Sequence, residues 1–270
     1  MPEDLFRRAL TCLLTRDVDA KLALVAALEA DWRQGRLVFE DGHAPPEPIN
    51  EPGRPDRPML VSAREVEQRK VSTLEGRAAL IHSLAHIEFN AINLALDAAY
   101  RFRGLPKEFY DGWLQVAAEE ACHFALLRNH LHALGFDYGD FTAHNGLWDM
   151  AMKTAHDPLV RMALVPRVLE ARGLDVTPAI MHKLASCGDK RAVEILEIIL
   201  RDEIGHVRIG NRWYAWFCAR RGVEPIATFR QLLREYSAPQ FRPPFHRNAR
   251  LAAGFSEAEM VMLEDFSASE

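Results

Sequence analysis

Apolar residues recur every three or four positions over most of the chain, which is the spacing of one face of an α-helix. The pattern predicts helices over most of the chain, so we expect an all-α fold. The strongest stretches predict four long helices, at about residues 73–102, 107–134, 158–173 and 189–221. Gly135 and Gly222 follow the second and fourth helices directly, where a helix commonly ends on glycine.

Shorter periodic stretches surround these four helices. Residues 3–35 predict one or two helices, and the proline-rich residues 41–63 predict an extended connector. Further short helices are expected at about 147–154, 177–187, 228–236 and 256–266. We expect a single domain made of an N-terminal extension, a four-helix core and a C-terminal extension, at residues 1–63, 64–222 and 223–270.

Two residues inside the predicted helices need an explanation. Pro166 lies within the third helix and should kink it, because proline removes one backbone hydrogen bond. Gly205 lies within the fourth helix, where it costs about 1 kcal/mol relative to alanine. A close approach of a neighbouring helix or of a metal cluster at Gly205 is one explanation.

The chemistry of the chain lies in a repeated motif of glutamate and histidine. Glu120-Ala-Cys-His123 and Glu203-Ile-Gly-His206 each carry Glu-x-x-His, which places both side chains on one helical face. Glu88 precedes the first motif by 32 residues, and Glu170 precedes the second by 33. Four carboxylates and two imidazoles from four helices are the ligands of a dinuclear metal site in a helical bundle. Such ligands suit iron or manganese.

A single Glu-x-x-His motif is weak evidence, since Glu40-Asp-Gly-His43 repeats it beside prolines, where no helix is expected. Alone, each glutamate is more often a helix-edge residue with its carboxylate in water. The other two motifs differ because they lie in apolar helical stretches, where an unpaired carboxylate would cost several kcal/mol. A metal cluster would neutralise all four carboxylates. His82 and His86 point away from Glu88, so we expect packing or solvent roles for them.

These residues resemble the ferritin-like superfamily of carboxylate-bridged di-iron proteins. Three stretches are similar to an uncharacterised branch of that superfamily, a domain of unknown function, namely Ile87–Ile92, Leu169–Asp175 and Pro239–Phe255. A better understood relative with the same ligand pattern is the bacterial tRNA hydroxylase that acts on a modified adenosine. The resemblance implies a ferritin-like four-helix bundle with additional N- and C-terminal helices. It implies two iron ions, with manganese as the alternative, held by Glu88, Glu120, His123, Glu170, Glu203 and His206.

Three functions are compatible with such a site. The leading one is an O2-dependent di-iron oxygenase or hydroxylase, in which His123 and His206 each cap one ion. Either Glu120 and Glu203 or Glu88 and Glu170 would then bridge the ions. The second is a ferroxidase or metal-binding protein without an organic substrate, and the third is a structural or partner-binding bundle. The substrate would be a modified nucleoside or another small molecule, and the oligomeric state is open, with a homodimer among the alternatives.

Charge and composition restrict the expected binding partners and cellular location of the protein. The formal net charge of −5 gives no general attraction to nucleic acid. No run of about 18 apolar residues predicts a membrane span, and the first residues do not resemble a secretory signal, which favours the cytoplasm. The four cysteines form no Cys-x-x-Cys pair, so the chain lacks the signature of a rubredoxin-type module. We therefore expect a separate reductase.

Overall fold

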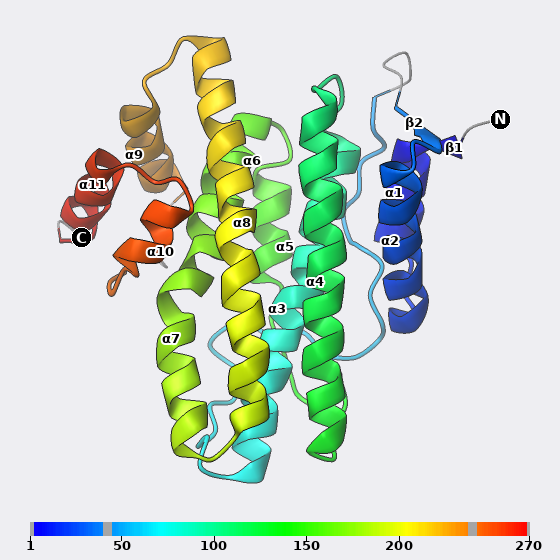
Figure 1. The fold of residues 1–270 in the computed structure, drawn as a ribbon, viewed down its shortest axis with the longest axis vertical. Helices are drawn as coiled ribbons and strands as arrows, with labels where there is room; N and C mark the ends of the chain where they lie inside the picture. Colours follow the sequence, from blue (N-terminus) through cyan, green and yellow to red (C-terminus); the bar gives the residue numbers. More distant parts are fainter. Residues whose placement is uncertain (1–2, 40–44, 237–241, 269–270) are drawn as a thin grey trace. The chain divides into compact units, whose positions relative to one another are not determined.

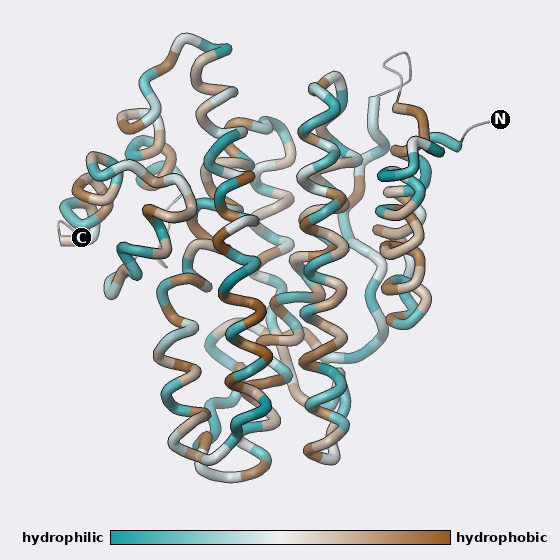
Figure 2. Tube along the Cα trace, in the orientation of Figure 1, coloured by the Kyte–Doolittle hydropathy of each residue, from teal (hydrophilic) through white to brown (hydrophobic). Residues whose placement is uncertain are grey.

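A computed structural model describes residues 3–39, 45–236 and 242–268, and it confirms the all-α class (Figure 1). The Glu40–His43 motif and Pro239 lie outside the described residues. The chain divides into two compact units, Met1–Met152 and Lys153–Glu270, which are described separately. Figure 2 shows hydrophobic and hydrophilic stretches alternating along the helices of both units, as the sequence pattern predicts.

Unit 1 is built on a hairpin of two long helices. The first of them begins at the N-cap Thr73, and the second ends before Gly135, whose φ of 86° suits glycine. Two shorter helices cover this hairpin, α1 against α3 and α2 against α4, and a parallel pair of two-residue strands joins their ends. The elements are β1 Glu3–Asp4, α1 Leu5–Leu14, α2 Val18–Arg33, β2 Leu37–Val38, α3 Leu74–Arg101, α4 Lys107–Ala133 and α5 Gly146–Lys153.

A buried lysine fixes α1 and α2 to α3. The Lys21 side chain is fully buried, and its Nζ donates hydrogen bonds to Cys12 O at 2.8 Å, Leu13 O at 3.0 Å and Asn93 Oδ1 at 2.8 Å. The two carbonyls belong to the last turn of α1, where the helix supplies no i+4 N–H, and Leu13 O also accepts from the Gly53 N–H at 2.8 Å. Asn93 lies on α3. The contact therefore sets the position of the helix that carries Glu88.

Unit 2 is organised around its longest helix. α6, the following π-helical segment and α7 form one continuous path that packs along α8, and α9, α10 and α11 follow. α8 ends at Gly222, which has a left-handed backbone with φ of 66°. The elements are α6 Pro158–Leu164, η1 Val165–Glu170, α7 Ala171–Ser186, α8 Lys190–Arg221, α9 Pro225–Glu235, α10 Arg247–Ala252 and α11 Glu257–Ala268.

The third long helix differs from the sequence prediction. It does not end at Gly173, and no separate helix begins at Thr177, because α7 runs without a break to Ser186 with Pro178 in its interior. Packing against α8 outweighs the roughly 3 kcal/mol that an interior proline costs. Around Pro166 the backbone forms the wide π-helical turn η1. The wider turn accommodates Pro166, which has no backbone N–H to donate to the preceding turn.

Gly210, rather than Gly205, is the glycine of close approach on α8. A Cβ atom added at Gly210 would overlap with Cβ and Cγ of Pro166, so α8 contacts the π-helical turn through this glycine. A Cβ added at Gly205 would have no heavy atom within 4 Å among the described residues, so the expected close approach of a neighbouring helix there is wrong. The glycine contact places Glu170, one turn after Pro166, on a segment held against α8.

A buried ion pair fastens the C-terminal part of unit 2 to α7. Arg250 and Asp175 are 1% and 6% exposed, and the guanidinium donates two hydrogen bonds to the carboxylate, at 2.9 and 2.7 Å. The backbone N–H of His246 donates to the same carboxylate at 2.8 Å. Paired donors of this kind make the strongest charge-assisted hydrogen bonds. α10 was not predicted from the sequence, and this ion pair holds it in place.

The two glycines of α8 give opposite predictions. Gly210→Ala should lower the free energy of unfolding by about 2 kcal/mol, because the new methyl group has to displace Pro166. The matched control Gly205→Ala should raise it by up to about 1 kcal/mol, because a helical glycine is replaced in open space. Urea unfolding of the two variants measures both values, and an equal effect of the two would contradict the packing described.

Removing the buried guanidinium should be costly. Arg250→Ala leaves the buried Asp175 carboxylate with only the longer 3.8 Å contact to Arg172, and should lower the free energy of unfolding by about 3 kcal/mol. Arg191→Ala is the control, because Arg191 pairs with Glu194 on the surface, at 57% and 59% side-chain exposure. That exposed pair should contribute less than about 1 kcal/mol. Chemical denaturation of both variants compares the two, and similar losses would refute the assignment.

Candidate metal centre

The α3–α4 hairpin brings three of the six predicted ligands together. Glu88 comes from α3, and Glu120 and His123 come from adjacent turns of α4. All three are buried, at 4%, 0% and 1% exposure. His123 Nδ1 lies 3.3 Å from Glu120 Oε2 and 3.4 Å from Glu88 Oε2. One ligand atom from each residue lies within 4.8 Å of the other two, so this group could hold a metal ion.

The three groups perturb one another strongly. Burial, together with the neighbouring charge of Glu120, raises the pKa of Glu88 well above its usual 4.5. Burial alone would lower the pKa of His123, but the hydrogen bonds and charges of Glu120 and Glu88 outweigh it and raise that pKa to about 11. The two neighbouring carboxylates therefore favour a proton on the imidazole. A cation could replace that proton, because a metal ligand must be the neutral imidazole.

The donor atoms fit a transition metal. Glu88 Oε2 is buried, and apart from the 3.4 Å contact with His123 Nδ1 it has no hydrogen-bond partner within the described parts of the chain, which is a costly arrangement for a carboxylate oxygen. A metal ion would satisfy that oxygen and would bind Glu120 and His123 at the same time. Two carboxylates and one imidazole are hard and borderline ligands, which iron and manganese accept.

Unit 2 carries the other three predicted ligands. Glu203 and His206 lie one turn apart on α8, at 9% and 1% exposure, with Glu203 Oε1 3.8 Å from His206 Nδ1. Glu170 is the last residue of the π-helical segment η1 and is half-buried. The helix brings Glu203 and His206 onto one face as their spacing predicts, whereas Glu170 comes from a separate segment that packs along α8.

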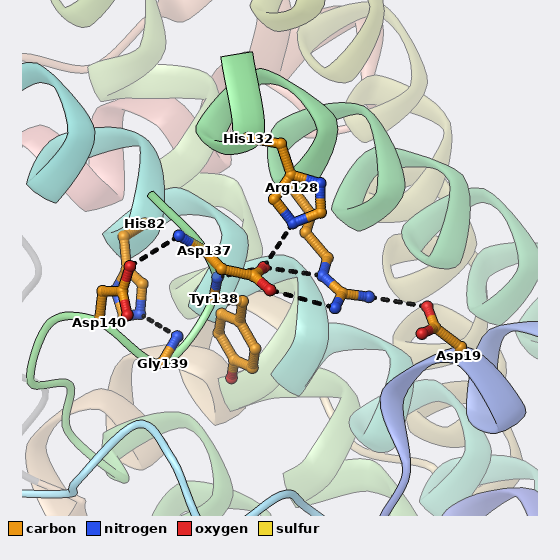
Figure 3. A network of polar contacts seen from close by, with 8 residues as sticks. All are labelled: Asp19, His82, Arg128, His132, Asp137, Tyr138, Gly139 and Asp140. Atoms are coloured by element: carbon orange, nitrogen blue, oxygen red, sulfur yellow. Dashed lines mark hydrogen bonds and ion pairs between the residues drawn. The ribbon is translucent and has the colours of Figure 1, made fainter. Parts of the chain in front are cut away.

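Two histidines beside this group hold a loop rather than a metal. His82 Nε2 accepts a hydrogen bond from the Gly139 N–H at 2.9 Å (Figure 3), and His86 Nδ1 lies 2.9 Å from the Tyr138 hydroxyl. The next residue along the loop, Asp140, accepts from the Asp137 N–H at 2.8 Å. The predicted packing role of both histidines is therefore confirmed. No sequence signal identified their loop partners, which lie more than 50 residues away.

The same loop is tied to α4 and α2. The Asp137 carboxylate accepts from Arg128 Nε at 2.9 Å and contacts His132 Nε2 at 2.8 Å, while Arg128 reaches Asp19 on α2 at 2.7 Å (Figure 3). Burial alone would raise the pKa of Asp137, but the hydrogen bonds, led by that of Arg128, lower it to about 2. The charged network thus fixes the end of α4 against its neighbours.

One hollow in unit 1 lies away from the candidate ligands. It has a volume of about 850 Å³ and lies between the end of α1 and the proline-rich connector, with Leu14, Arg16 and residues 51–60 as its lining. A second hollow of about 390 Å³ is lined by α3 and residues 140–142. Neither includes a candidate ligand, so the chemistry of the carboxylates and imidazoles, not the hollows, marks the site.

A helical fold with a buried carboxylate–imidazole group defines a candidate metal-binding protein. The chain belongs to the family described as Protein of unknown function (DUF455), which matches residues 14–261. It is similar to an uncharacterized protein of Haemophilus influenzae (strain ATCC 51907 / DSM 11121 / KW20 / Rd), with 52% identity over 213 residues. That alignment covers 76% of this chain and 74% of the relative. No solved structure matches the chain.

None of the helices in residues 3–39, 45–236 and 242–268 combines the length and the apolar character needed to cross a bilayer. Charged side chains lie along the long helices at intervals too short for such a segment.

Because His82 and His86 are buried, we expect the free energy of unfolding to fall as the pH is lowered. Burial lowers the pKa of both His82 and His86 to about 4, from 6.5. Between these values the unfolded chain binds more protons than the folded one, so stability falls as the pH falls from 6.5 towards 4. Protonation of each histidine should lower the free energy of unfolding by about 2 kcal/mol between pH 7 and pH 4.5.

Replacing both with glutamine removes this titration. The free energy of unfolding of the His82→Gln, His86→Gln variant should depend less on pH over that interval than that of the wild type. Urea unfolding at pH 7 and pH 4.5 measures the difference. An unchanged pH dependence would show that the two imidazoles are not buried in their neutral form.

Proposed function

We propose that this protein is a non-haem di-iron, or iron–manganese, oxidoreductase of the ferritin-like type, acting as an O2-dependent oxygenase or hydroxylase. The observation that carries the proposal is the buried group of Glu88, Glu120 and His123, whose donor atoms fit iron or manganese. Glu170, Glu203 and His206 would supply the second half of the ligand set. The repeated spacing of the two sets along the chain supports this pairing.

In such an enzyme, the residues of the chain would bind the two ions and keep bulk water away from them. Glu88 and Glu120 offer carboxylates able to bridge or chelate, and His123 offers a single nitrogen on the same helical face as Glu120. Glu203 and His206 repeat that pair on α8. The apolar surroundings of α3 and α4 keep bulk water from the ligands, which strengthens their hold on a cation. When bound, iron would supply the reaction with dioxygen.

The proposal includes partners. The substrate would be a modified nucleoside or another small molecule, and electrons would come from a separate reductase in the cytoplasm. The cysteines support an external electron source, because Cys12 and Cys218 are buried singly and the chain contains no Cys-x-x-Cys motif. A homodimer is part of the same proposal.

Metal analysis tests the proposal directly. Protein purified without chelator should contain about two iron or manganese ions per chain. Glu120→Ala with Glu203→Ala should abolish binding, because one carboxylate is lost from each half of the ligand set. Glu119→Ala is a matched control, since Glu119 accepts a hydrogen bond from Gln115 and is offset by one residue from Glu120.

The outcomes separate the candidate functions. About two ions per chain, retained in the control and lost in the double variant, together with oxygen uptake after anaerobic Fe(II) loading, would support the oxidoreductase. Bound metal that consumes no dioxygen would point to a metal-binding role instead. Absence of iron and manganese after reconstitution would refute the di-iron proposal.

A further inference from the structure

The C-terminal half of α8 carries a basic stripe that the candidate metal centre does not use. Arg208, Arg212, Trp216 and Arg220 follow one another at intervals of four residues, so they share one helical face about 18 Å long. The three arginines are exposed and Trp216 is partly exposed. The sequence from residue 204 to residue 223 contains no aspartate or glutamate.

Two arginines of the stripe, Arg212 and Arg220, are held against aromatic rings, whereas Arg208 donates hydrogen bonds to Ala252 O at 3.2 and 2.8 Å. The Arg220 guanidinium lies 5.0 Å from the centre of the Trp216 ring, and that of Arg212 lies 5.6 Å from the centre of the Trp213 ring. Neither Arg212 nor Arg220 forms an ion pair with any described residue. Stacking keeps a guanidinium in place without neutralising it. The face therefore presents fixed positive charge around a tryptophan.

Two tryptophans connect this face with the ligand-bearing part of α8. Trp213 is buried and packs edge-on against Trp216, with 5.3 Å between the ring centres. Trp213 follows His206 by seven residues, which places it on the same helical face about 10 Å further along the axis. A partner bound at Trp216 would thus be close to the end of the helix segment that carries Glu203 and His206.

We propose that the Arg212–Trp216–Arg220 face of α8 is the docking site of an acidic one-electron carrier protein. This inference rests on the proposed function, for which the carrier supplies the electrons. Each encounter would oxidise the carrier by one electron and reduce the oxidoreductase by one. The charge of the face is complementary to an acidic partner, and arginine and tryptophan are the residues that dominate protein interfaces energetically.

The small size of the face favours a carrier protein over nucleic acid. Weak electron-transfer complexes bury less surface than other specific complexes, and a single helical stripe is enough for them. Nucleic-acid binding commonly uses a larger basic surface on a basic domain, whereas this chain has a formal net charge of −5. Single-stranded RNA is therefore the competing ligand to be tested.

A binding experiment on the metal-free full chain tests the docking site. The probe is an oxidised acidic plant-type [2Fe–2S] ferredoxin, titrated by calorimetry at low and at high salt. We expect Kd to rise with salt, and Arg212→Glu with Arg220→Glu to raise it by at least about tenfold. Trp216→Leu should raise it by about fivefold.

The control places the same change of charge at the other end of the helix. Lys190→Glu with Arg191→Glu should change Kd by less than about twofold, because both residues lie in the first turn of α8. Circular dichroism and thermal melting establish that each variant is folded. The proposal is overturned if the ferredoxin does not bind, if the control loses as much affinity, or if a 20-nucleotide single-stranded RNA binds this face more tightly than the ferredoxin.

The design separates this inference from the proposed function. Binding is measured without metal, so docking that depends on Trp216 and the two arginines supports the site whatever the metal content is. A chain that takes up iron but does not bind the carrier keeps the proposed function and loses this docking site.

Discussion

The cost of burying carboxylates inside helices is the constraint on which the rest of this structure depends. Two buried carboxylates of unit 2 are paired with guanidinium groups: Arg250 pairs with Asp175, and Arg167, stacked among aromatic rings, pairs with Glu259 at 2.5 Å. In unit 1 the basic group beside Glu88 and Glu120 is an imidazole. A guanidinium keeps its protons under all ordinary conditions, whereas an imidazole can release one and bind a metal. This difference separates the candidate metal centre from the structural ion pairs.

Much of the helical architecture could be predicted, because its signals are local. Thr73 and Asp189 cap α3 and α8, Gly135 and Gly222 follow α4 and α8, and the apolar period marks the helices between them. The two Glu-x-x-His motifs are equally local, since a helix alone decides which of their residues share a face. The proximity of Glu120 and His123 to Glu88 in unit 1 follows from the short connection between α3 and α4. The identity of the bound metal is inferred from the ligand types alone and stays a prediction.

The features that could not be predicted depend on partners distant in sequence. Arg250 and Asp175 are 75 residues apart, and Lys21 and Asn93 are 72 apart, so no periodic pattern links them. Both pairs lie in or near stretches that the sequence marks only as amphipathic. The two α8 glycines show the same limit: the sequence presents Gly205 and Gly210 alike, and only the place of Pro166 distinguishes them. The sequence shows that both glycines lie within a helix, but only the tertiary contact with Pro166 shows which of them packs closely.

The π-helical turn at Val165–Glu170 works as a shift of phase within one continuous helical path. A π turn contains about one residue more than an α turn, so every side chain after it is rotated by roughly 100° relative to an uninterrupted α-helix. A fixed apolar period read through this region therefore loses its register. In evolutionary terms, one inserted residue is enough to turn Glu170 and all of α7 towards a different neighbour while leaving α6 unchanged.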